Sequence, residues 1–131
     1  MNVLLDTCTV IWAASDPDAL SNAARELLLA RDSAVHVSPA SCAEIACLQE
    51  RGRIEITEHW RTWFDRCLAD NGWRVLDITL RIVQEAYALP ETFHRDPVDR
   101  LIVGTARVHD CTLVTADTHI LAYPHVRSLR A

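Results

Sequence analysis

Residues 2–6 read NVLLD, a short apolar run that ends in an acid. Such a run is typical of a strand that is buried on both faces. Further strand candidates are residues 34–37 (AVHV), 73–78 (WRVLDI), 113–115 (LVT) and 125–129 (HVRSL). The sequence therefore predicts four to five short strands, beginning close to the N-terminus.

Helix signals separate these strands. Helices are predicted at residues 10–14, 23–31, 39–50, 58–71, 80–89 and 97–109, with Ser21, Ser38, Thr79 and Asp96 as start signals. In residues 58–71, apolar side chains recur at helical spacing, which indicates a face packed in the core: Trp60, Trp63, Phe64, Cys67 and Leu68. Alternating strands and helices predict an α/β fold, with a parallel sheet flanked by helices.

Composition limits the classes of protein. A chain of 131 residues, half of them apolar, is expected to form a single domain over residues 1–131. No apolar run is long enough to cross a membrane and no basic leader precedes the first acid, so we expect a cytoplasmic protein. The five cysteines form no CxxC pair, which disfavours a thiolate zinc site. The net charge is −5, so any attraction for a nucleic acid must be local.

Four acids stand where strands end or helices begin: Asp6, Glu44, Asp99 and Asp117. In a parallel α/β sheet these positions meet at the carboxyl edge, where such sheets bind ligands. Two carboxylates about 4 Å apart repel by about 1 kcal/mol in water and about 4 kcal/mol at an effective dielectric near 20. A hard divalent ion relieves that repulsion, which favours Mg²⁺ or Mn²⁺ and metal-assisted phosphodiester hydrolysis.

A structural role is also open for most of these acids. Glu44 follows Ser41 at the spacing of a capping box, Asp96 precedes a proline as an N-cap, and Asp117 precedes a short helical segment. Asp6 is expected to have no comparable capping role.

The motifs resemble a known family. Residues 4–12 (LLDTCTVIW), 38–46 (SPASCAEIA), 94–106 (HRDPVDRLIVGTA) and 113–120 (LVTADTHI) are similar to the PIN domain, and more narrowly to VapC-type toxins of toxin–antitoxin modules. The resemblance runs along the whole chain. It implies a PIN-like parallel sheet and a metal-dependent endoribonuclease that cleaves RNA.

The resemblance also implies a site. It makes catalytic metal ligands of Asp6, Glu44, Asp99 and Asp117, and it places Asp99 ahead of Asp96, which remains an additional candidate ligand. Thr7 and Thr115 match hydroxyl residues that support the family's acids, and Gly104 stands where a small residue is usual. Family members are commonly homodimers that a partner antitoxin holds inactive.

Other side chains near the acids have open roles. Arg95 and Arg100 are candidates for contacts with RNA or antitoxin, or they pair with nearby acids. His94 either aids substrate binding or is an exposed loop residue, and Trp12 and Trp73 remain candidates for base stacking.

Two alternatives differ in class. An aspartyl-phosphate protein of the receiver type needs a lysine near its last strand, and this chain has none. A non-catalytic acidic α/β interaction module stays open, and the discriminating change is Asp6→Asn, which abolishes cleavage only if the chain is a nuclease.

Overall fold

The computed structural model describes residues 1–131 and contains one parallel sheet of five strands. The strand order is β3-β2-β1-β4-β5, so the first strand lies at the centre. The strands are β1 (Asn2–Leu5), β2 (Ala34–Val37), β3 (Arg74–Val75), β4 (Thr112–Thr115) and β5 (Ser128–Arg130). Every pair of neighbouring strands is parallel. The predicted α/β class and its parallel sheet are confirmed.

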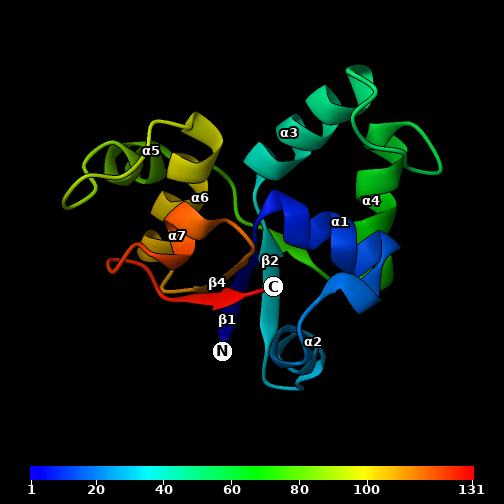
Figure 1. Cartoon of the computed structure of the whole chain (residues 1–131), viewed down its shortest axis with the longest axis horizontal. Coiled ribbons are helices and arrows are strands. Elements are labelled where there is room, and N and C mark those ends of the chain that lie inside the picture. The colour runs from blue at the N-terminus through cyan, green and yellow to red at the C-terminus, as the bar shows by residue number, and fades with distance from the viewer.

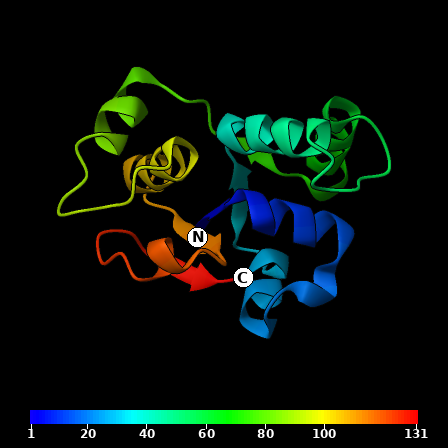
Figure 2. The same cartoon turned by 45° about the horizontal axis from the view of Figure 1, so that its top comes forward.

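Helices cover both sides of the sheet. They are α1 (Thr7–Ser15), α2 (Asn22–Leu29), α3 (Pro39–Glu50), α4 (Trp60–Asn71), α5 (Leu80–Ala86), α6 (Pro97–Val108) and α7 (Thr118–Leu121), with one 3₁₀ turn at Pro17–Ala19. Helices α1 to α4 lie on one side of the strands and α5 to α7 on the other (Figure 1), and the turned view keeps the same grouping (Figure 2). None of these helices has both the length and the apolar character needed to cross a membrane.

The central strand shows why residues 3–5 are all apolar. Val3 and Leu5 belong to the core cluster shared with α1 to α4, whereas Leu4 belongs to the cluster shared with α6 and α7. Successive side chains of a strand point to opposite faces, and all three are fully buried. Burial on both faces therefore explains why no polar side chain lies between the exposed Asn2 and Asp6.

Several element boundaries differ from those predicted. The first helix begins at Thr7 rather than at residue 10, because Asp6 caps it. Of residues 73–78 only two are in a strand, since β3 is an edge strand that pairs with β2 over two positions. The last strand lies at Ser128–Arg130 rather than at residues 125–129.

The tryptophans and Phe64 pack in the core rather than forming an aromatic surface. Trp63 and Phe64 of α4 are buried, as the helical spacing predicted. Trp73 belongs to the same core cluster, and Trp12 packs against it while partly buried. Burial of Trp73 in this cluster removes it as a platform for base stacking.

A close approach between α5 and α6 fixes Gly104. A Cβ atom at Gly104 would lie 2.9 Å from the carbonyl oxygen of Ile82 and 3.0 Å from the backbone nitrogen of Ala86. Only glycine lets these two helices pack at this separation.

Candidate active site: an acidic pocket at the carboxyl edge of the sheet

A pocket of about 310 Å³ lies where β1 and β4 end. The chain brings together all five acids that the sequence singled out, from four separate segments. The lining residues are Asp6, Thr7, Cys8, Glu44, Asp96, Asp99, Ala116 and Asp117.

Asp6 is the most buried acid of the pocket, with 6% of its surface exposed. Its Oδ1 accepts hydrogen bonds from the backbone N–H of Thr9 (3.0 Å) and from the Thr9 hydroxyl (2.8 Å), and its Oδ2 accepts one from the hydroxyl of Thr115. Burial raises the pKa of Asp6, an effect that these hydrogen bonds oppose and the charge of Asp117 reinforces. The expectation that Asp6 has no capping role is wrong, because Asp6 is the N-cap of α1.

Threonine hydroxyls hold the acids in place. Thr115 Oγ1 donates to Asp6 and accepts from the backbone N–H of Asp117 at 3.0 Å, so one hydroxyl orders two acids. Thr7 Oγ1 donates to Ser41 Oγ at 3.2 Å and so joins α1 to the helix that carries Glu44. The two threonines therefore support the pocket from different sides.

Asp96 and Asp99 stand at the start of α6 with different roles. Asp96 caps the helix, since its Oδ1 accepts from the backbone N–H groups of Val98 and Asp99. Asp99 lies one turn further on, and its Oδ2 is 2.9 Å from Nε2 of His94. The pKa of Asp99 is raised to about 7, with burial as the largest cause and the neighbouring carboxylates, Asp96 first, contributing the rest.

Asp117 and Glu44 complete the pocket. Asp117 caps α7 through Oδ1, which accepts from the backbone N–H groups of His119 and Ile120, and this leaves Oδ2 for another ligand. Glu44 has no capping duty, because Ser38 and not Ser41 caps α3. The predicted capping box is therefore wrong, and the carboxylate of Glu44 faces the pocket.

Comparison with known proteins identifies the family. Residues 3–126 match the PIN domain. The chain belongs to the PIN-domain family. The resemblance drawn from the four motifs is thereby confirmed.

Relatives of this PIN domain include a VapC protein. This chain is 36% identical over 125 residues to Ribonuclease VapC22 of Mycobacterium tuberculosis (strain H37Rv). The alignment covers 95% of this chain and 94% of that protein. The fold of this chain is similar to a chain of VapBC2 from Rickettsia felis bound to a promoter DNA fragment, with a TM-score of 0.74, 20% identity and coverage of 99% and 98%. It is also similar to a chain of a toxin–antitoxin complex from Klebsiella pneumoniae, with a TM-score of 0.65, 19% identity and coverage of 97% and 95%.

The donor set of this PIN domain fits a hard divalent ion. The lining offers carboxylate oxygens, which Mg²⁺ and Mn²⁺ prefer, and no lysine or arginine reaches into it. After burial, the repulsion of the neighbouring carboxylates is the second kind of effect that raises the pKa of Asp99. A bound cation removes that repulsion, so Asp6, Glu44, Asp99 and Asp117 are suited to hold one.

The sequence left the role of His94 open and did not mark Cys8 as a site residue. His94 is partly buried against Asp99 rather than exposed. Cys8 also lines the pocket, and partial burial of its thiol together with the surrounding carboxylates raises its pKa, which keeps the thiol protonated at neutral pH. The position of Cys8, two residues after Asp6, was the available signal for it, whereas the sequence offered none for the pairing of His94.

The two arginines beside the acids differ in their contacts, because Arg100 is bound to the protein and Arg95 is exposed. Arg100 donates from Nη1 to the carbonyl of Ala86 (3.1 Å) and from Nη2 to the carbonyl of Phe93 (3.0 Å), and its guanidinium lies over the ring of Tyr87. It therefore ties the loop before α6 to the end of α5 and is not free for RNA, nor does it pair with an acid. Arg95 is exposed and makes no ion pair, so it remains a candidate contact for RNA or a partner.

Proposed function

We propose that this PIN domain is the toxin of a toxin–antitoxin pair, acting in the cytoplasm as an endoribonuclease that requires Mg²⁺ or Mn²⁺. The similarity to Ribonuclease VapC22 supports RNA as the substrate and hydrolysis as the reaction. The single observation that carries the proposal is the convergence of Asp6, Glu44, Asp99 and Asp117 on one pocket. Asp96, whose Oδ1 is used by its helix cap, is a secondary ligand at most.

The acids of the pocket have different roles in holding a metal ion. Asp6 is held rigid by Thr9 and Thr115, so its carboxylate offers a fixed geometry at the centre of the sheet edge. Asp99 and Asp117 offer oxygens from the starts of two helices. A bound divalent ion supplies the positive charge that steadies the phosphate and lowers the pKa of the attacking water.

An antitoxin and a second copy of the chain are the proposed protein partners. The fold likeness to chains of VapBC2 and of a toxin–antitoxin complex supports the antitoxin. A homodimer is supported by α5, which exposes apolar side chains at helical spacing: Leu80, Val83 and Tyr87. Light scattering of the purified chain measures the oligomeric state directly.

The deciding experiment is cleavage of labelled RNA by wild type and Asp6→Asn in the presence of Mg²⁺. An asparagine preserves the cap, because its amide oxygen accepts from Thr9 while its amide N–H donates to the Thr115 hydroxyl. We expect a loss of about 100-fold or more in rate, with an unchanged far-ultraviolet circular dichroism spectrum. The matched control is Asp65→Asn, on the exposed face of α4, which should cleave like wild type.

The opposite result favours the non-catalytic interaction module. If Asp6→Asn cleaves RNA as fast as wild type in Mg²⁺, or if wild type cleaves RNA in EDTA as fast as in Mg²⁺, the carboxylates are not the catalytic groups. If no variant cleaves RNA while a partner protein still binds all of them, the domain is a binding module.

A further inference from the structure

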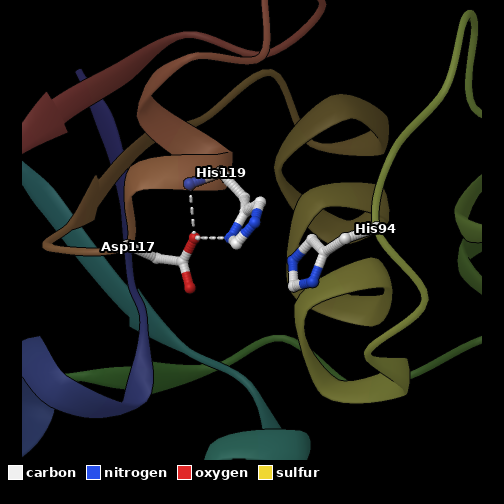
Figure 3. A group of neighbouring side chains, drawn as sticks. All are labelled: His94, Asp117 and His119. Atoms are coloured by element: carbon white, nitrogen blue, oxygen red, sulfur yellow. Dashed lines mark hydrogen bonds and ion pairs between the residues drawn. The ribbon is translucent and has the colours of Figure 1, made fainter.

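A second group of potential metal ligands lies beside the acidic pocket. His94, Asp117 and His119 each place one ligand atom within 4.8 Å of the others. Figure 3 shows the three side chains pointing toward one another, His94 from the loop before α6 and the other two from the start of α7. Only Asp117 is shared with the lining of the acidic pocket.

The two imidazole rings are arranged to face the same space. They are stacked, with centroids 4.5 Å apart and an angle of 19° between their planes. Nδ1 of His119 lies 3.6 Å from Oδ1 of Asp117. Imidazole lone pairs lie in the plane of the ring, so these two stacked rings can share one cation only after the exposed His119 ring turns.

His94 reaches this group from a contact with the acidic pocket. Its buried Nε2 lies 2.9 Å from Oδ2 of Asp99. A cation that takes a nitrogen of His94 therefore competes with that contact. The His119 side chain, in contrast, has no such contact with Asp99, and it is 66% exposed and free to turn toward such a cation.

The donor set selects the kind of ion. Two imidazole nitrogens and one carboxylate suit a borderline ion such as Zn²⁺, whereas Mg²⁺ prefers oxygen ligands. Zinc binds such ligands at about 2.0–2.1 Å, so its tetrahedral ligands lie about 3.4 Å from one another. The ligand atoms of His94, Asp117 and His119 now lie within 4.8 Å of one another, and rotation of the exposed His119 side chain brings them to that distance.

We propose that His94, Asp117 and His119 form a Zn²⁺ site that is separate from the carboxylate site and competes with it for Asp117. A zinc ion there would withdraw Asp117 from the acidic pocket and turn His94 away from Asp99. Occupation of the zinc site therefore opposes assembly of the carboxylate site. Under the proposed nuclease function, Zn²⁺ would act as an inhibitor.

The first test is a Zn²⁺ titration against a chromophoric chelator, in buffer that contains Mg²⁺ and no RNA. Wild type and His109→Ala, an exposed histidine at the end of α6, should bind one equivalent with equal affinity. His119→Ala, which keeps the backbone N–H that Asp117 caps, should lose at least about tenfold in affinity. Equal affinity of His119→Ala and wild type would overturn the proposal, as would loss of binding in Cys8→Ser with retention in His119→Ala.

The second test follows the imidazole signals by NMR. Zn²⁺ added in buffer that already contains Mg²⁺ should shift the ring resonances of His94 and His119 together, and the shift should be complete at one equivalent. Movement of other histidines while these two stay unchanged would contradict the assignment. Neither test depends on RNA cleavage, so failure of the zinc site and failure of the nuclease proposal give different results.

Discussion

Replacement of Asp99 by asparagine should stabilise the metal-free protein at alkaline pH. The pKa of Asp99 is raised from 3.8 to about 7 in the folded chain, so the folded state binds a proton more tightly than the unfolded state. Between these two values the unfolded state has already lost its proton, and the free energy of unfolding falls as the pH rises. Asparagine carries no such charge, so the free energy of unfolding of the variant does not fall with pH for this reason.

The magnitude follows from the shift. A difference of about 3 pKa units corresponds to an upper limit of about 4 kcal/mol above pH 7. Asp99 is still 19% exposed, which lets solvent screen part of the repulsion. The carboxylate also interacts favourably with the start of α6, by about 0.3–1 kcal/mol, and asparagine loses that. We therefore expect a gain of about 1–3 kcal/mol, or roughly 3–10 °C in Tm.

Thermal unfolding in EDTA at pH 5 and pH 8, followed by tryptophan fluorescence, measures this difference. Asp99→Asn should exceed wild type at pH 8 by more than at pH 5, and added Mg²⁺ or Mn²⁺ should raise the Tm of wild type more than that of the variant. Asp65→Asn should match wild type throughout. A variant that is less stable than wild type at pH 8 in EDTA would refute the reasoning, because attraction to His94 would then outweigh the repulsion.

Three further changes test other contacts. Thr115→Val should lower the free energy of unfolding by about 1–3 kcal/mol and slow cleavage, since Asp6 loses a donor; urea unfolding and an RNA assay measure both. Gly104→Ala should cost about 1–3 kcal/mol by overpacking against α5 while the Tm still responds to Mg²⁺, and an unchanged Tm would contradict the close approach. Arg100→Ala should destabilise by about 1–3 kcal/mol by leaving two carbonyls unpaired, whereas Arg95→Ala should weaken RNA binding, measured by fluorescence anisotropy, without changing stability.

The parallel sheet and the meeting of the acids could be predicted because they depend on local patterns. An apolar run such as residues 2–6 is explained by burial on two faces, and Pro39 and Pro97 mark helix starts in the sequence itself. Strand order then brings the ends of β1 and β4 together. Acids at those ends become neighbours without any detailed knowledge of side chains.

Contacts that join distant residues could not be predicted. The hydroxyl of Thr115 reaches Asp6 across 109 positions of sequence, and that bond depends on the register of β1 against β4. The guanidinium of Arg100 finds two carbonyls that only the path of the loop before α6 exposes. His94 meets Asp99 for the same reason, since a loop conformation has no periodic signature.

The helix caps have a consequence for how firmly an ion is held. Asp6, Asp96 and Asp117 each give oxygen lone pairs to the first turn of a helix, so three helix starts direct their partial positive charge at the same pocket. That positive field offsets some of the pull that the carboxylates exert on a cation. Under the proposed magnesium dependence, the bound ion should accordingly exchange rapidly with the surrounding solution, and the rate of RNA cleavage would rise and fall with the free magnesium concentration instead of saturating at trace levels.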